Sequence, residues 1–359
     1  MATTIAGEKE YLQTLSILTL CPERAPDAVP HVAVLTPQQR SEFIELANSH
    51  HVVVRSLRAL ATATQDNAEL QQWIASILAS EQARIENALK FLDRICQELE
   101  RAGCPVTVMK SLDHWPDLGG DLDLYSSADA RAIRDVFVRT LGAHVEPRSW
   151  GDQLAHKWNF ALPGLPESVE IHSQRLGQTG EHVVLAQRFV TRRVVRNIGG
   201  YAFLVPAPEE RIIVATLQRM YRHFYFRVCD IANSAALVEN AEVDFNELRR
   251  AAGMGGIWPG VATYLAIVSD YVKQYRGRPL TLPESVLKAA RFGGDKLYVL
   301  RRFLRVPLLP EGAELYTKQV ASTALRGDVP ATFRLSLLPP LAAAASVAFK
   351  ITGNDKGIW

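Results

Sequence analysis

Apolar residues recur at intervals of three and four along two long parts of this chain, and they alternate with polar residues in the part between. The first helical part covers about residues 36–102. It opens on Thr36, which has the form of an N-cap before a proline. A long helix is expected over residues 70–102, ended by Gly103. Its apolar positions are Ile74, Ile77, Leu78, Ile85, Leu89, Leu92, Cys96 and Leu99.

Residues 103–206 have a different texture. A helix is expected over residues 126–141, capped by Ser126 or Ser127 and ended by Gly142. Short runs of β-branched and aromatic residues, several of them alternating with polar residues, predict strands. These runs cover residues 106–109, 121–125, 158–162, 168–173, 183–195 and 201–205. Strands mixed with a helix indicate a small α/β or α+β domain.

The helical pattern returns after Pro208. One helix is expected over residues 209–238, because two glutamates in its first turn suit the helix dipole. Further helices are expected over residues 245–252, 261–275, 283–290 and 296–304. The sequence therefore predicts an α+β fold. A small mixed-sheet core at residues 103–206 lies between an N-terminal helical region (1–102) and a C-terminal helical region (207–359).

The composition is that of an ordinary globular protein. The chain has 359 residues, and its 48% of hydrophobic residues exclude a disordered protein. Its 40 basic and 38 acidic residues give a net charge of +2, which does not favour binding to nucleic acid or to an anionic membrane. The four cysteines make neither a Cys-x-x-Cys pair nor a disulfide framework, so a cytoplasmic location is expected.

No stretch of the sequence has the roughly 20 mostly apolar residues of a transmembrane helix, so integral membrane association is not expected. Residues 253–269 and 335–349 lack charged side chains, but prolines interrupt both stretches. We expect buried helices or turns there. The alternative for residues 335–349 is a C-terminal segment that touches a membrane or a partner.

The strongest sign of chemistry is the run of two glycines and alternating Asp and Leu at residues 119–124. On a strand, Asp121 and Asp123 point to the same face. Two close carboxylates repel each other, and a divalent cation such as Mg²⁺ removes that conflict. Gly120 lets a ligand approach the backbone closely. The alternative is a solvated turn, because an Asp-x-Asp occurs by chance about once in a chain of this length.

Two flanking segments strengthen the prediction of a metal site. An expected strand runs into Lys110 and Ser111, a turn that offers backbone N–H groups, a hydroxyl and a positive charge to a phosphate. A later strand carries Glu170 and His172 on one face. Three carboxylates on adjacent strands suit a two-metal transfer, in which two of them bridge both ions and the third holds the ion that activates a hydroxyl.

The spacing of these segments resembles the nucleotidyltransferase superfamily of the DNA polymerase β type. More narrowly, the chain looks like a bacterial nucleotidyltransferase family with a Lys-Gly turn before its Asp-x-Asp strand and often a His after its third carboxylate. The similarity covers about residues 40–270. The chain departs from the family twice. Ser111 stands where the narrow family tends to have Gly, and residues 115–120 contain no Arg, which members often carry there.

The resemblance implies transfer of a nucleoside monophosphate from an NTP, such as ATP, to a hydroxyl or phosphate acceptor, with release of pyrophosphate. Two Mg²⁺ ions would be required. Asp121 and Asp123 would bind the metals, and Glu170 would be the third ligand and the base for the acceptor. The acceptor, a small molecule or a macromolecule, is not specified. The nucleotide would lie against Lys110, Ser111, Gly120, His172, His223 and Arg227.

The helix expected after the core carries His223, Arg227 and Asp230 at positions i, i+4 and i+7, on one face. In the functional interpretation this face lines a cleft, and His223 and Arg227 reach the phosphates or the base from its far side. The guanidinium of Arg227 suits phosphate. The alternative is an ion pair between Arg227 and Asp230 beside a packed histidine. Arg219 and Arg222 would add a basic rim.

Two other hypotheses stay open. In the first, the chain is a nucleotide-binding or partner-binding protein that keeps this fold without catalysis. In the second, it is a toxin-like enzyme that modifies RNA or protein. Conversion of bound NTP to pyrophosphate separates the first from an active transferase. Labelling of tRNA or protein acceptors tests the second.

Overall fold

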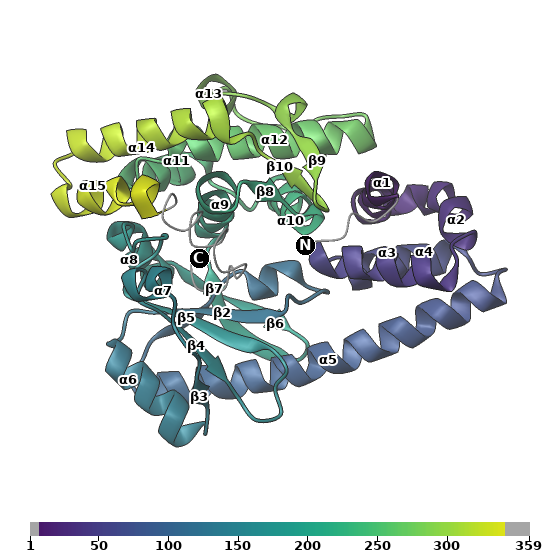
Figure 1. The fold of residues 1–359 in the computed structure, drawn as a ribbon, viewed down its shortest axis with the longest axis horizontal. Coiled ribbons are helices and arrows are strands. Elements are labelled where there is room, and N and C mark those ends of the chain that lie inside the picture. The colour runs from purple at the N-terminus through teal and green to yellow at the C-terminus, as the bar shows by residue number, and fades with distance from the viewer. Residues whose placement is uncertain (1–6, 342–359) are drawn as a thin grey trace.

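A mixed β-sheet lies between a body of helices from both ends of the chain and one long helix (Figure 1). This architecture is seen in a computed structural model that describes residues 7–341. The predicted α+β fold, with helical regions on both flanks of a small mixed sheet, is confirmed.

The N-terminal region is helical, as predicted. Thr36 Oγ1 accepts a hydrogen bond from the N–H of Gln39, so the expected N-cap is present as a full capping box. Gly103 adopts a φ of +72° just after the long helix, which only glycine reaches without strain. The helices are α1 (Glu8–Leu20), α2 (Ala25–Ala33), α3 (Pro37–Ser49), α4 (Val53–Ala63) and α5 (Ala68–Arg101).

The central sheet has five strands in the order β1-β2-β5-β4-β3. Strands β2 and β5 are parallel, and the chain between them includes the helix α6; the other neighbours are antiparallel. The elements of this part are β1 (Val106–Val108), β2 (Asp121–Ser126), α6 (Ala130–Asp135), β3 (His144–Val145), α7 (Trp150–Leu154), β4 (Lys157–Ala161) and β5 (Ser168–Ser173). In this register Asp123 lies directly beside Glu170.

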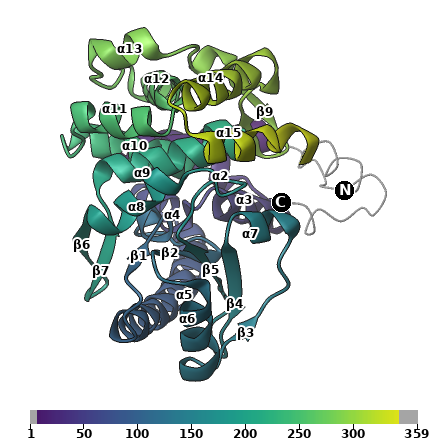
Figure 2. The ribbon, with the colours of Figure 1, turned by 90° about the vertical axis from the view of Figure 1, so that its left-hand side faces the viewer.

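The alternation of side chains along β2 gives the sheet two different faces. Leu122 and Leu124 are fully buried in the apolar core that the sheet shares with α5 (Figure 2). Asp121 and Asp123 therefore point to the opposite face. A slip by one residue would expose both leucines, at a cost of about 1.5–3 kcal/mol each. The hydrophobic pattern thus decides which face carries the carboxylates.

Residues 183–191 were predicted as part of a strand, and this is wrong. They form helix α8 (Val183–Thr191), in which Leu185, Ala186 and Phe189 are buried at helical spacing. The preference of β-branched residues for strands depends on a suitable sheet surface, and the packing of α8 against neighbouring elements overrides it. The strands that follow, β6 (Arg193–Ile198) and β7 (Tyr201–Pro206), pair antiparallel as a hairpin.

The helix expected over residues 126–141 begins later than predicted. Asp129, and neither serine, caps α6 by accepting the N–H of Arg131. The Ser126 hydroxyl accepts the N–H of Ala128 instead, at 3.1 Å. The helix continues as a π-helical turn (Val136–Thr140).

The single helix predicted over residues 209–238 is wrong, because the chain turns in its middle. Helix α9 (Pro208–Thr216) continues as a π-helical turn (Leu217–Arg222), and strand β8 (Tyr225–Phe226) precedes α10 (Val228–Glu239). The helix predicted over residues 296–304 is also wrong. That segment forms β9 (Tyr298–Leu300) and β10 (Phe303–Arg305), which make a three-stranded sheet with β8. The partner of β8 lies far along the chain, so a local pattern does not reveal it.

The remaining predicted helices are confirmed, and residues 253–269 lie mostly in the buried helix α12. Of the stretch predicted over residues 335–349, residues 342–349 lie outside the described part. Among residues 7–341 no helix is long and apolar enough to span a membrane. The C-terminal helices are α11 (Phe245–Met254), α12 (Trp258–Arg276), α13 (Glu284–Ala289), α14 (Ala313–Leu325) and α15 (Val329–Ser336).

The two helical regions share one apolar core although they are far apart in the sequence. Leu15 and Phe43 from the N-terminal helices belong to the same buried cluster as Ile231 and Leu265 from α10 and α12. The beginning of α5 joins this cluster, and the rest of α5 joins the core of the sheet. Helix α5 therefore connects the helical body to the sheet (Figure 1).

An ion pair between Arg188 of α8 and Glu247 of α11 joins the two helices. We therefore expect the stability of the protein to depend on pH. Hydrogen bonds from Arg250 and Arg188 lower the pKa of Glu247 from 4.5 to about 2, against a smaller effect of burial. The ionised Glu247 therefore stabilises the folded state fully above pH 4.5, and this stabilisation is lost as the pH falls towards 2. We expect Glu247→Gln to flatten the decline in the free energy of unfolding between about pH 5 and pH 3, measured with urea. The exposed control Glu242→Gln should keep the wild-type decline, and equal slopes for all three proteins would contradict this assignment.

Candidate active site

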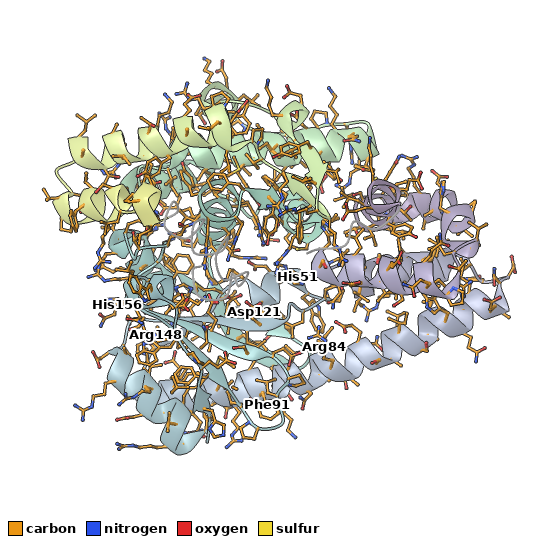
Figure 3. The ribbon with its side chains drawn as sticks, viewed as in Figure 1. His51, Arg84, Phe91, Asp121, Arg148 and His156 are labelled. Carbon is orange, nitrogen blue, oxygen red and sulfur yellow. The ribbon has the colours of Figure 1, made fainter. Side chains whose placement is uncertain are left out.

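Three carboxylates meet on the open face of the sheet. Asp121 and Asp123 come from β2 and Glu170 from β5, and one oxygen of each lies within 4.8 Å of the others. Asp121 is exposed, whereas Asp123 and Glu170 are only 5% and 9% exposed. Asp121 lies near the middle of the molecule, below the C-terminal helices (Figure 3). The structure thus brings together the three carboxylates that the sequence singled out.

The environment of Asp123 opposes its negative charge. Burial raises the pKa of Asp123 well above its usual value, and the nearby charges of Asp121 and Glu170 raise it further, although Lys110 acts in the other direction. The Oδ1 atom of Asp123 is buried, and the cation in contact with it is Lys110 Nζ. An all-oxygen set of three carboxylates, one of which is disfavoured in its charged form, fits Mg²⁺.

Glu170 is held in its ionised form by cationic neighbours. Burial alone would raise its pKa, but Lys110, a hydrogen bond from His172 and Lys157 together hold it well below the usual value. Lys157 Nζ lies 2.6 Å from Glu170 Oε2, and His172 Nε2 lies 3.0 Å from Glu170 Oε1. Sequence reasoning missed Lys157, because only the pairing of β4 with β5, in which Lys157 lies opposite His172, brings it within reach of Glu170.

Lys110 lies between two of the carboxylates. Its φ of +52° is unusual for a residue other than glycine, and such strain is concentrated at functional sites. The Nζ atom contacts Asp123 Oδ1 and lies 3.8 Å from Glu170 Oε1. Burial opposes the charge of Lys110, but the carboxylates outweigh it and raise its pKa.

Ser111 and Gly120 lie at the entry to β2. The hydroxyl of Ser111 accepts the N–H of Asp123 at 2.7 Å and donates to the carbonyl of Asp121 at 3.3 Å. It therefore holds the strand that carries the two aspartates. Gly120 is exposed, with open space where a side chain would begin. At Gly119 a Cβ would lie 3.4 Å from His51 Cε1 and 3.5 Å from Asp121 Oδ1.

The turn before β2 is anchored to two helices by residues that sequence reasoning missed. Asp117 is buried and accepts the N–H groups of Val54 and Arg55 at the start of α4. Arg84 of α5 donates to the carbonyls of Leu118 and Gly119, at 2.9 and 3.2 Å. These contacts fix the position from which the strand enters the site.

Loss of the Arg84 anchor is expected to destabilise the protein. Arg84 also pairs with Glu167, whose side chain is 2% exposed. In Arg84→Ala this buried carboxylate has lost its partner, so we expect a loss of about 3 kcal/mol in the free energy of unfolding. Urea unfolding measures it. Adding Glu167→Gln to Arg84→Ala should restore part of the lost free energy of unfolding. The exposed control Arg94→Ala should change the free energy of unfolding little. A neutral Arg84→Ala would show that the anchor is dispensable.

A pocket of about 190 Å³ opens over the carboxylates, and its opposite wall is basic. This wall comes from the segment between α9 and α10. Arg219 Nε lies 2.7 Å from Asp230 Oδ2, whereas neither Arg222 nor Arg227 has an ion pair within residues 7–341. The Nε atoms of these two arginines are buried without a hydrogen-bond partner among the described residues. The lining residues are His51, Lys110, Ser111, His114, Gly119, Asp121, Asp123, Glu170, Gln218, Arg219, Arg222, His223, Tyr225 and Arg227.

The interruption of the predicted helix changes how two residues reach this pocket. His223 and Arg227 do not share a helix face, because His223 ends the π-helical turn and Arg227 precedes α10. Both nevertheless line the pocket. The alternative ion pair of Arg227 with Asp230 is absent from the described residues. Asp230 accepts the backbone N–H of Arg227 at 2.7 Å and pairs with Arg219.

The N-terminal region contributes a histidine that no motif marked. His51, in the turn between α3 and α4, stacks on His114 with ring centroids 4.8 Å apart, and both line the pocket. Burial, followed by the charge of Arg227, holds the pKa of both imidazoles well below the usual value. The two rings are therefore neutral near pH 7. His51 is directed from the N-terminal helices towards the region of Asp121 (Figure 3).

Comparisons with known proteins give only weak likenesses to solved structures. No family model and no curated protein matches the chain. Among solved structures, the chain is similar to an antigenic nucleotidyltransferase-like protein from Paracoccidioides brasiliensis, with 18% identity and a TM-score of 0.31. The match covers 46% of this chain and 85% of that protein. A TM-score this low does not establish a shared fold, so the function proposed below rests on the geometry of the site.

Proposed function

We propose that this protein is a Mg²⁺-dependent nucleotidyltransferase, which moves a nucleoside monophosphate from an NTP to a hydroxyl or phosphate acceptor and releases pyrophosphate. One observation carries the proposal. A single pocket has three carboxylates on its sheet wall and three arginines on its helical wall. A bound divalent cation would lie against the carboxylates, and a bound polyphosphate would lie against the arginines. Each ligand would reduce the repulsion between the like charges of its wall.

The arginine wall is suited to the phosphates of the donor. A guanidinium presents a planar fork of N–H donors that matches phosphate oxygens. Arg222 and Arg227 lack carboxylate partners among the described residues, so their donors are available to a ligand. This wall also supplies the positive charge that the missing arginine before Asp121 provides in the similar family. Lys110 adds a cation beside the carboxylates of the sheet wall.

The carboxylates would act on the reacting atoms. Asp121, Asp123 and Glu170 would hold Mg²⁺, which when bound polarises the α-phosphate and stabilises the charge that develops on it. The acceptor oxygen forms a bond to the α-phosphorus while the bond from that phosphorus to the bridging oxygen breaks. Pyrophosphate leaves with the electron pair. The hydroxyl proton passes to the Glu170 carboxylate as the acceptor oxygen attacks, and from there to bulk water.

A second function is favoured by the cations around Glu170. Lys110 and Lys157 already balance this carboxylate without a metal, and His172 is hydrogen-bonded to it. A nucleotide-binding or partner-binding protein that has lost catalysis would have the same arrangement. The nucleotide-binding protein would bind NTP without releasing pyrophosphate, and the partner-binding protein need not bind NTP.

Calorimetric titration of each of the four NTPs, with and without Mg²⁺, tests the proposal. We expect Mg²⁺-dependent binding of at least one NTP, because the ion and the triphosphate neutralise opposite walls of one pocket. Pyrophosphate release in the presence of an acceptor then separates the two functions. Failure of every NTP to bind in the presence of Mg²⁺ would refute the transferase and the nucleotide-binding protein, and would leave the partner-binding protein.

A further inference from the structure

A second and larger cavity opens beside the charged pocket. Its volume is about 800 Å³, within the range of about 300–1,000 Å³ that is typical of sites for small molecules. The two cavities share lining residues, among them Lys110, Gln218 and Tyr225. The larger cavity therefore adjoins the charged pocket at these side chains.

The lining of the larger cavity is mainly apolar and aromatic. It includes Leu176, Leu217, Tyr221, Phe224, Leu309 and Tyr316. Leu308 and Leu309 are 60% and 78% exposed, and both belong to the lining. Exposed leucines that continue into an apolar cavity indicate a binding site for an apolar molecule.

The charges of the larger cavity exclude a polycationic ligand. Lys110, Arg222 and Arg305 supply positive charge. The carboxylate of Glu181 is already used, because its Oε2 atom accepts the N–H and the hydroxyl of Thr179, at 2.9 and 3.1 Å. Within the described lining no other Asp or Glu is present. An amine-rich sugar would therefore meet net repulsion.

The larger cavity adjoins the site on the side of Glu170. His172, which is hydrogen-bonded to Glu170, lines the larger cavity and not the charged pocket. Its Nδ1 atom is buried and has no hydrogen-bond partner in the described part of the chain. Asp121 and Gly119 line only the charged pocket. The donor phosphates and the occupant of the larger cavity would thus approach the carboxylates from different sides.

We propose that the larger cavity binds the acceptor, and that the acceptor is an apolar or aromatic hydroxyl compound without positive charge. This inference rests on the function proposed above. The apolar body of the acceptor lies against Leu217 and Phe224, and its hydroxyl reaches past His172 to the carboxylates. Oxygen–phosphorus bond formation and loss of pyrophosphate follow as described for the general reaction.

Fluorescence titration of the full chain with the neutral probe N-phenyl-1-naphthylamine tests the cavity. The variants Leu309→Asp and Ala313→Trp place a charge at the lining and fill the space, respectively. We expect each to weaken probe binding about tenfold. The control Leu325→Asp changes a leucine that is 89% exposed and lies outside the lining, and should bind like wild type. Absence of probe binding, or equal binding by all four proteins, would overturn the proposal.

Saturating Mg²⁺ and the NTP identified by calorimetry then distinguish an acceptor cavity from a site for the nucleobase. The acceptor assignment requires the probe and the NTP to bind together, with probe affinity changed less than about twofold. Displacement of the probe by NTP would overturn this inference while leaving the nucleotidyltransferase proposal intact. Failure of all NTPs to bind would instead refute the nucleotidyltransferase proposal, and the acceptor assignment with it.

A competition experiment tests the chemical class. With Mg²⁺ and NTP present, we expect 1-naphthol, an uncharged aromatic hydroxyl compound, to displace the probe. A polycationic aminoglycoside should not displace it at a tenfold higher concentration. Displacement by the aminoglycoside and not by 1-naphthol would overturn the proposed acceptor class.

Discussion

Replacing Asp121 or Asp123 by asparagine is expected to abolish nucleotidyl transfer and to leave the protein folded. Asparagine keeps the size of the side chain but removes the charge that a divalent cation requires. We expect the rate of pyrophosphate release to fall by about a thousandfold or more, because metal stabilisation of the transition state is lost. Without metal, burial and the neighbouring carboxylates disfavour the charge of Asp123, whereas its ion pair with Lys110 favours it. The thermal midpoint of Asp123→Asn without Mg²⁺ should therefore stay close to that of wild type.

The matched control for these variants is Asp135→Asn, an aspartate on α6 outside the pocket. It should keep wild-type turnover and Mg²⁺ dependence. Retained turnover in Asp121→Asn or Asp123→Asn would refute the metal assignment. A large fall in the thermal midpoint would show instead that these aspartates stabilise the fold.

Removal of the unpaired arginines is expected to weaken NTP binding without weakening the fold. Each charge-assisted hydrogen bond contributes about 1.5–3 kcal/mol, so Arg222→Ala and Arg227→Ala should each raise the Kd of Mg²⁺·NTP by about tenfold or more. The double variant should raise it by about a hundredfold. Calorimetry measures the Kd. Because neither guanidinium has an ion pair within residues 7–341, their loss removes repulsion between cations.

Two further variants separate charge from geometry at this wall. Arg227→Lys keeps the charge and loses the planar fork, so its Kd should lie between those of wild type and Arg227→Ala. The exposed residue Arg58 of α4 offers a control outside the pocket, and Arg58→Ala should bind NTP like wild type. An unchanged Kd in the double variant would show that the donor phosphates do not lie against this wall.

The carboxylate site could be predicted from the sequence because its geometry is local. Alternation along a strand places Asp121 and Asp123 on one face, and the leucines between them decide which face is buried. Glu170 required one further step, the pairing of β5 with β2. The resemblance of the three segments to a known family supplied that step, and the structure confirms the pairing.

The opposite wall of the pocket could not be predicted in the same way. The expected helix over residues 209–238 would have placed His223 and Arg227 on one face, but the chain breaks there. Strand β8 forms because β10, almost eighty residues later, pairs with it. Helical periodicity describes how a segment packs against one surface, and it does not show whether a distant strand competes for the same backbone hydrogen bonds.

The residue pattern alone predicts the helical flanks, the strands of the core and the face of β2 that carries the aspartates. Helical periodicity and alternation along a strand depend on residues that are close in the chain. Packing between distant segments places the rest of the site: the contact of Lys157 with Glu170, the position of His51, the anchor from Arg84 and the basic wall. Each of these depends on which elements pack together. The stable packing is the one that buries the most apolar surface over the whole chain, and no single segment specifies it.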